Sequence, residues 1–513
     1  MNGAEALART LAAAGIDTCF ANPGTSEMHF VSALDRVAGL RCVLGLAETV
    51  VAGCADGYGR MAGKPAATLL HCGPGLANGV ANFHNARRAH TPIVSLVGDQ
   101  ATYHRPHDAP LTADTEGLAR SVSAWVHTSN SSKTVGADAA AAVQAALAPP
   151  GGIATLVLPA DCAWDEGAAP AAPLAVPERE SVSSASVREI ARALRTGLSS
   201  MILLSGPALS DKGLKTAHLI SRATGAKLRA PTQVPRMARG RGRVPVDRIP
   251  YVVDAALKVL QGTKHLVLAG AKAPVGFFAY PGKPSTLWPV DCSVHLLARP
   301  EQDVAGALEL LADELGAPLD VSIPEPGPRP DARRGAFKPD AFGHTLAALL
   351  PENAIVAEDA VTSGRALFGL TFGAAPHDWI QLTGGAIGYA FPAATGAAIA
   401  CPGRKVVCLQ ADGGGMYSLQ ALWTQARESL DVVNVVFANR RYAILQGELA
   451  AVGAQPGPAS EALFDISRPE IRWTRLAEGM GVEAARVKNL ESFADVFRAA
   501  CARRGPFLIE FSI

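Results

Sequence analysis

Apolar residues gather along the chain in short runs that polar or glycine-rich turns separate. These runs have the length of buried strands and lie at 18–21, 43–46, 67–70, 93–97, 153–158, 201–204, 265–268, 355–357, 406–410, 432–437 and 507–512. Between two of them, Leu419, Leu422, Trp423 and Ala426 recur at the spacing of one helix face. Because consecutive strand, helix and strand segments form a right-handed unit with parallel strands, the pattern predicts an α/β fold with mainly parallel sheets flanked by helices.

Two segments without this pattern divide the chain. Residues 166–180 are rich in Ala, Pro and Glu, and residues 316–337 contain five prolines and several charges. We interpret both as linkers between three doubly wound domains, which would span residues 1–165, 181–316 and 338–513.

Charge and composition limit the partners that we expect. The formal net charge of +1 argues against a nucleic acid or an anionic membrane. No apolar run reaches the roughly 18 residues of a membrane span. The nine cysteines form no CxxC motif, which indicates reduced thiols and a cytoplasmic protein. The basic, glycine-rich segment 236–243 is interpreted as a mobile charged loop, with contact to a nucleotide phosphate as the alternative.

Polar residues follow two consecutive predicted strands. Asp412, Gly413 and Gly414 come just after the strand at 406–410, and Asn439 follows the strand at 432–437. The carboxyl ends of parallel strands meet at one edge of a sheet, where such sheets bind ligands. Oxygen donors suit Mg²⁺, and glycines let backbone N–H groups approach a phosphate. The segment therefore predicts a magnesium-diphosphate site; the alternative is a surface aspartate and a turn asparagine.

This arrangement of Asp-Gly and Asn resembles the thiamin diphosphate motif. Over its whole length the chain resembles the acetolactate synthase and benzoylformate decarboxylase family, and YSLQALWTQARE at 417–428 is nearly that family's own wording. Ala411 departs from it, because the family usually has Gly there. The resemblance implies thiamin diphosphate and Mg²⁺, a small 2-oxo acid substrate, and a homodimer or homotetramer with active sites at the subunit interface. FAD, which acetolactate synthases bind, is not favoured because no nucleotide fingerprint is found.

The resemblance also assigns residues to the cofactor. The metal ligands would be Asp412, Asn439 and the backbone oxygen of Arg441. Ile387 would be the bulky side chain that holds the cofactor bent. The full set of cofactor-binding candidates is Pro23, Gly24, Glu48, Asn78, Thr362, Ser363, Gly384, Gly385, Ile387, Asp412, Gly413, Gly414, Asn439, Tyr442, Ala443 and Ile444.

Three residues are candidates for catalysis. Glu48, at the start of a predicted helix, is either an ordinary carboxylate at a helix N-terminus or a buried carboxylate of raised pKa. The resemblance favours the second role, in which Glu48 hydrogen-bonds the aminopyrimidine ring. His71 is either a satisfied polar group or a general acid or base. Thr25 would contact the substrate, although Thr25 or Ser26 could instead cap the following helix.

Two departures from the family pattern bear on the reaction. Leu111 stands where acetolactate synthases carry Gln, and Phe278 stands where benzoylformate decarboxylases carry a second catalytic His. We expect decarboxylation of a 2-oxo acid followed by carboligation, as in acetolactate synthase. The alternatives are a simple 2-oxo acid decarboxylase of the benzoylformate type and a non-catalytic paralogue that retains cofactor binding.

Overall fold

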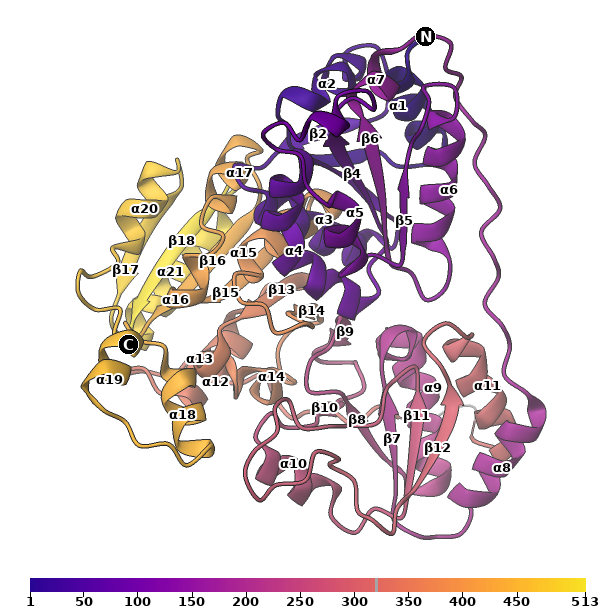
Figure 1. The fold of residues 1–513 in the computed structure, drawn as a ribbon. Helices are drawn as coiled ribbons and strands as arrows, with labels where there is room; N and C mark the ends of the chain where they lie inside the picture. Colours follow the sequence, from indigo (N-terminus) through magenta and orange to yellow (C-terminus); the bar gives the residue numbers. More distant parts are fainter. Residues whose placement is uncertain (319–321) are drawn as a thin grey trace.

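The computed structural model describes residues 1–318 and 322–513, which form three α/β bodies (Figure 1). Each body is built around one mainly parallel sheet with helices on both faces, which confirms the predicted fold class. The extended segment at 166–180 runs along one side of the molecule from the N-terminal body to the central one. Among the described residues, no helix is both long and apolar enough to cross a membrane.

The N-terminal sheet has the strand order β2-β1-β3-β4-β6-β5, and all its neighbours are parallel. Its strands are β1 (Thr18–Asn22), β2 (Arg41–Leu44), β3 (Ala66–Leu70), β4 (Ile93–Asp99), β5 (Trp125–Thr128) and β6 (Ile153–Pro159). One face is covered by α1 (Gly3–Ala13), α2 (Met28–Leu34), α6 (Val135–Leu147) and α7 (Ala160–Trp164). The other face is covered by α3 (Glu48–Ala62), α4 (Cys72–Ala89) and α5 (Thr115–Arg120).

The central sheet has the order β10-β8-β7-β11-β12 and is also parallel throughout. Its strands are β7 (Ser200–Leu204), β8 (Lys227–Ala230), β10 (Asp247–Arg248), β11 (His265–Ala269) and β12 (Ser293–Ala298). The helices α8 (Ser184–Leu194), α9 (Asp211–Thr224) and α11 (Val304–Leu315) cover one face, and α10 (Val253–Leu260) covers the other.

The C-terminal sheet has seven strands in the order β17-β18-β16-β15-β13-β14-β9. Its parallel strands are β13 (Ala354–Asp359), β14 (His377–Gln381), β15 (Val406–Ala411), β16 (Val432–Ala438), β17 (Glu483–Val487) and β18 (Phe507–Ser512). One face packs on α12 (Pro339–Leu349), α14 (Leu367–Leu370) and α21 (Leu490–Ala502). The other packs on α15 (Ala390–Ala400), α17 (Ala421–Arg427) and α20 (Trp473–Gly479).

The basic segment at 236–243 is not a loop throughout, so that prediction is wrong for Arg236–Arg239. Arg236–Arg239 forms β9, which pairs antiparallel with β14 at the edge of the C-terminal sheet. The guanidinium carbon of Arg239 lies 3.4 Å from the ring centroid of Phe368 and 4.3 Å from that of Phe372, and the side chain is buried. Arg236 pairs with Asp378 at 3.0 Å. These contacts place the charges of Arg236 and Arg239 within the fold.

The N- and C-terminal bodies meet where α3 packs against α15. Both helices are rich in small residues, and two glycines are required by the close approach. A Cβ atom on Gly57 would lie 2.1 Å from the carbonyl oxygen of Ala393, and one on Gly396 would lie 1.9 Å from that of Cys54. The Ala and Gly content of these segments is therefore explained by helix-to-helix packing between two bodies.

Candidate functional site

The structure places Asp412 and Asn439 at the same edge of the C-terminal sheet, as predicted. The parallel pairing of β15 with β16 puts Ala411 opposite Phe437, so both strands end at this edge. Asp412 begins the short helix α16 (Asp412–Gly415) and is buried. One carboxylate oxygen accepts from the N–H of Gly413 at 2.9 Å and the other from the N–H of Arg440 at 2.6 Å.

Burial raises the pKa of Asp412, although these backbone donors act in the opposite direction. A carboxylate in such a place favours a nearby cation, because the cation would restore its ionised form. Asn439 is half-buried, and its amide oxygen accepts from the N–H of Arg441 at 3.1 Å. The side-chain atoms that could bind a metal here are oxygens, which fits a Mg²⁺ ion that also binds phosphate.

The glycines after β15 are needed for side chains to pack closely. A Cβ on Gly413 would lie 2.4 Å from Cε1 of Tyr442, and one on Gly414 would lie 3.0 Å from Nε2 of Gln410 and 3.6 Å, an ordinary contact distance, from Cβ of Ile387. Tyr442 and Ile387, both predicted to bind the cofactor, therefore lie beside this turn. Ala411 has φ of −76°, so the methyl group that replaces the usual glycine causes no backbone strain.

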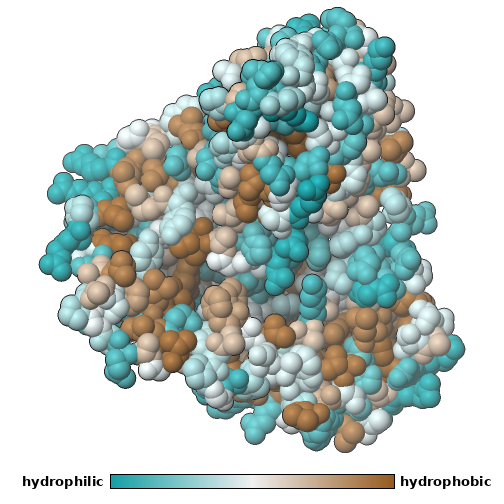
Figure 2. All heavy atoms as spheres, in the orientation of Figure 1, coloured by the Kyte–Doolittle hydropathy of each residue, from teal (hydrophilic) through white to brown (hydrophobic). Residues whose placement is uncertain are grey.

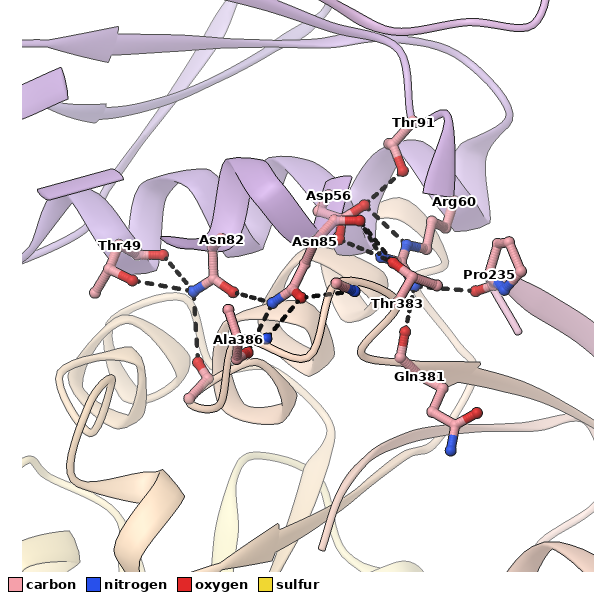
Figure 3. A network of polar contacts seen from close by, with 12 residues as sticks. Thr49, Asp56, Arg60, Asn82, Asn85, Thr91, Pro235, Gln381, Thr383 and Ala386 are labelled. Atoms are coloured by element: carbon pink, nitrogen blue, oxygen red, sulfur yellow. Dashed lines mark hydrogen bonds and ion pairs between the residues drawn. The ribbon is translucent and has the colours of Figure 1, made fainter. Parts of the chain in front are cut away.

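The loop that carries Gly384, Gly385 and Ile387 is fixed by residues of the N-terminal body (Figure 3). Asn85 on α4 accepts from the N–H of Gly384 at 3.0 Å and donates to the carbonyl of Ala386 at 2.8 Å. Arg60 on α3, which is paired with buried Asp56, donates to the carbonyl of Gln381 at 2.6 Å. Because polar groups buried in this way need partners, the network determines the path of the loop.

Asp359, at the end of β13, holds the other side of the same loop and was missed by the sequence analysis. One of its oxygens accepts from the N–H groups of Gly388 and Tyr389, at 2.7 and 3.0 Å, and from the side chain of Gln410 at 3.1 Å. Its other oxygen is buried without a partner among the described residues. Burial raises the pKa of Asp359 to about 7. In the sequence, the feature that could have identified Asp359 as a site residue is its position at the end of a strand.

Thr362, Ala443 and Ile444 line one cavity. Thr362 and Ser363 lie in α13 (Val361–Gly364), whose N-cap is Ala360, so neither residue caps that helix. Ala443 and Ile444 begin α18 (Ala443–Ala451), which contacts α13. The cavity between these helices and the central body includes Thr362, Ala443 and Ile444 in its wall.

Glu48 is the first residue of α3, as predicted, but it is half-buried rather than buried. Its carboxylate accepts from the side chain of Asn22 at 3.0 Å and from that of Asn78 at 3.2 Å. A Cβ on Gly75 would lie 3.3 Å from the same carboxylate. Asn78 is exposed.

His71 lies between β3 and α4, with one ring nitrogen held inside the protein. Its Nδ1 is 3.0 Å from an oxygen of Glu27 and 3.0 Å from the hydroxyl of Ser26. The buried carboxylate of Glu27 is an acceptor that faces Nδ1, which favours the tautomer with the proton on Nδ1 and leaves Nε2 unprotonated. Cys72 Sγ lies 3.2 Å from the same Ser26 hydroxyl. Sequence reasoning missed Glu27, although it lies in the turn that was examined.

The turn at 22–27 packs directly on this histidine. A Cβ on Gly24 would lie 2.3 Å from the His71 ring, so only glycine fits there. Thr25 is exposed beside it, and Pro23 is half-buried. The helical turn Thr25–Glu27 begins after Gly24, whose N–H donates to Glu27 at 2.7 Å. Neither Thr25 nor Ser26 caps the helical turn, because the side chain of Glu27 accepts from the backbone N–H of Gly24 at its start. The hydroxyl of Ser26 instead contacts the side chains of Glu27 and His71.

The predicted residues form two separate groups in one chain. Glu48, His71 and Thr25 lie at the edge of the N-terminal sheet, and Asp412 and Asn439 lie at that of the C-terminal sheet. Among the described residues, no hydrogen bond or ion pair joins the groups. Large apolar side chains are exposed on the segments nearby: Met28, Leu46, Met416, Tyr417 and Leu445. Figure 2 shows hydrophobic side chains gathered on the C-terminal body around α18.

Comparison with known proteins agrees with this geometry. The family described as "Thiamine pyrophosphate enzyme, N-terminal TPP binding domain" matches residues 1–118, and its C-terminal TPP binding domain matches residues 366–511. A Mycobacterium tuberculosis protein provisionally named acetolactate synthase large subunit IlvX is 51% identical over 512 residues, covering 99% of this chain and 98% of its own. Benzoylformate decarboxylase of Pseudomonas aeruginosa is 28% identical, covering 97% and 96%.

A solved structure gives the same result for the fold. The thiamine diphosphate-dependent 4-hydroxybenzoylformate decarboxylase of Rhodococcus jostii superposes with a TM-score of 0.87 at 25% identity, covering 100% of this chain and 99% of that one. The two matched domains indicate thiamin diphosphate as the cofactor. The chain belongs to the thiamin diphosphate enzymes, in the family of the acetolactate synthase large subunits and benzoylformate decarboxylase.

Proposed function

We propose that the protein decarboxylates a 2-oxo acid, with thiamin diphosphate and Mg²⁺ bound between two copies of the chain. The observation that carries this proposal is the presence of two complementary half-sites. One contains Glu48 and His71, and the other contains Asp412 and Asn439. Both are intact, which argues against a non-catalytic paralogue.

Each half-site has a distinct task. Asp412, Asn439 and the backbone oxygen of Arg441 would hold Mg²⁺, while the N–H groups of the glycine-rich turn approach the diphosphate. Glu48 would hydrogen-bond the aminopyrimidine ring and exchange a proton with it. When bound, thiamin diphosphate supplies the carbanion that attacks the keto carbon and accepts the electrons released as CO₂ leaves. A second copy of the chain would bring the two half-sites together and bury them, as a homodimer or homotetramer.

The geometry of His71 favours protonation of the product over carboligation. Its Nδ1 is fixed by Glu27, so Nε2 can take up a proton and the resulting imidazolium can return that proton to the reacting carbon. Such a step would release an aldehyde. Carboligation, the outcome favoured in the sequence analysis, is the second candidate, and the 51% identical relative named as an acetolactate synthase large subunit supports it.

Product analysis separates these reactions. The protein should be incubated with thiamin diphosphate, Mg²⁺ and either pyruvate or benzoylformate, and the products should be identified by mass spectrometry. Free aldehyde and CO₂ would support simple decarboxylation, and a hydroxyketone or acetolactate would support carboligation. Failure to release CO₂ from every 2-oxo acid tested, with cofactor binding shown by calorimetry, would contradict the proposed function.

The nine cysteines are all free thiols, and we propose a cytoplasmic location on that basis.

A further inference from the structure

Two cysteines lie opposite each other on neighbouring strands of the N-terminal sheet. Strands β1 and β2 are parallel, and Cys19 on β1 is the register partner of Cys42 on β2. Register partners direct their side chains to the same face of a sheet, and neighbouring strands lie about 4.8 Å apart. This separation falls within the range of about 4.4–6.8 Å between Cα atoms that a disulfide spans. The backbone therefore places the two thiols within reach of a covalent bond.

The position of Cys42 at the edge of the sheet allows the small adjustment that a bond requires. A disulfide needs Cβ atoms about 3.5–4.5 Å apart, which is slightly closer than facing residues of neighbouring strands usually lie. Strand β2 has four residues and is the outermost strand, and within the described ranges it pairs only with β1. A short outer strand can shift toward its neighbour without breaking a second set of strand hydrogen bonds.

The two thiols differ in their access to solvent. Among the nine cysteines, all of which lie in the described ranges, Cys42 alone is exposed. Cys19 has no exposed surface and belongs to the core cluster that includes Leu11 and Phe30. An oxidant in solution can therefore reach Cys42, whereas Cys19 can react only with a group that is already on Cys42.

Contact between the two thiols also favours reaction at Cys42. Interaction with the Cys19 thiol lowers the pKa of Cys42, although the carboxylate of Glu428 acts in the opposite direction. The same contact, together with burial, raises the pKa of Cys19. Because the thiolate is the form that attacks an oxidant, Cys42 is suited to be the nucleophile and Cys19 to be the thiol that reacts second.

We propose that Cys19 and Cys42 form a reversible disulfide when the protein meets a peroxide. First, the Cys42 thiolate attacks hydrogen peroxide: an S–O bond forms, the O–O bond breaks, and hydroxide leaves and takes up the proton lost from Cys42 to become water. Next, the Cys19 sulfur attacks the resulting sulfenic acid: the S–S bond forms, the S–O bond breaks, and the hydroxyl group leaves with the Cys19 proton as a second water. The thiols lose two electrons, which the peroxide gains, and a dithiol reductant reverses the bond.

The bond would join the two strands that lead into the Glu48 half-site. Strand β1 ends at Asn22, whose side chain donates to Glu48 at 3.0 Å, and the chain passes from β2 directly to Glu48 at the start of α3. Disulfides in cytoplasmic proteins are mostly transient and redox-sensing. We therefore expect this bond under oxidising conditions and two free thiols otherwise.

Mass spectrometry of the full-length protein tests the proposal. The protein is treated with hydrogen peroxide, and its remaining thiols are alkylated in denaturant without a reductant. The number of alkylated cysteines should fall from nine to seven, and digestion should release two peptides joined through Cys19 and Cys42. Dithiothreitol should restore all nine thiols. Retention of nine thiols after peroxide, or a disulfide between other cysteines in place of this pair, would overturn the proposal.

Three variants test the order of the two steps. In Cys42→Ser, Cys19 should stay reduced, and the matched control Cys401→Ser, at a partly exposed cysteine, should form the disulfide as the wild type does. In Cys19→Ser, the sulfenic acid at Cys42 should persist and be trapped by dimedone, a reagent that labels sulfenic acids. Oxidation of Cys19 in Cys42→Ser at the wild-type rate would overturn the proposal. If Cys19→Ser does not fold, the linked peptides of the wild type and the state of Cys19 in Cys42→Ser decide.

Discussion

His71 owes its orientation to residues that lie next to Thr25 in the sequence. Buried Glu27 and the hydroxyl of Ser26 both contact Nδ1, and Gly24 allows the turn to approach the ring. In the proposed reaction, a histidine held in this way would present one defined nitrogen to the substrate. The same logic applies wherever a carboxylate fixes the tautomer of a general acid or base.

The substitution Glu27→Gln should therefore reduce kcat for CO₂ release by about 10- to 1000-fold, because general acid–base catalysis contributes about 10²- to 10⁴-fold. Calorimetric binding of thiamin diphosphate should be nearly unchanged, because Glu27 is placed beside the histidine and not among the cofactor residues. Glu178→Gln, at an exposed position in the segment 166–180, is the control. A variant with full activity at Glu27 would show that the orientation of His71 is unimportant.

Asp359 gives a prediction for pH dependence. Its pKa is raised by burial from 3.8 to about 7, so the folded protein retains a proton that the unfolded chain releases between these values. Stability from this group is present at low pH and is lost as pH rises toward 7. Asp359→Asn cannot titrate. Relative to this variant, the wild type should lose about 2–3 kcal/mol of unfolding free energy between pH 5 and pH 8.

Urea unfolding of both proteins at several pH values between 5 and 8 measures this difference, and the contributions of other titrating groups cancel in the comparison. Parallel pH dependence of the two proteins would mean that Asp359 is ionised in the folded state throughout the range.

Elements that pack against segments close in the sequence were predictable. Elements that depend on contacts with residues far along the chain were not. The strands before Asp412 and Asn439 followed from apolar runs, and parallel pairing then placed both residues at one edge. Glu48 and His71 were found at the helix and strand ends where they were expected. Strand β9 was missed because its stability depends on β14 and on Phe368, which lie more than 120 positions further along the chain.

A substitution at Arg239 tests whether side-chain contacts with distant residues stabilise β9. Substitution by Ala removes a buried side chain that stacks on Phe368 and donates to the hydroxyl of Thr371 at 3.2 Å. We expect a loss of about 2–4 kcal/mol in unfolding free energy, measured by urea denaturation. The control Arg241→Ala removes a side chain that is 37% exposed and should cost under about 1 kcal/mol. Equal small effects at both positions would mean that β9 is held by its backbone alone.

For the whole molecule, the arrangement of the bodies keeps the two proposed half-sites apart within one chain. The close contact of α3 with α15, and the network around Arg60 and Asn85, fix the N-terminal body on the C-terminal one. In this arrangement no bond joins Glu48 to Asp412. Two chains related by a twofold axis would form two equivalent sites, each with Glu48 of one copy and Asp412 of the other.

The most direct test of this claim is complementation between two inactive variants, Glu48→Gln and Asp412→Ala. After the subunits are mixed and allowed to exchange, half of the dimers are mixed, and each mixed dimer contains one fully intact site. CO₂ release should therefore return to about a quarter of the wild-type rate. Each variant alone, treated in the same way, should remain inactive. If the mixture stays as inactive as the separate variants although exchange is demonstrated, Glu48 and Asp412 do not act across a subunit interface, and the central claim is wrong.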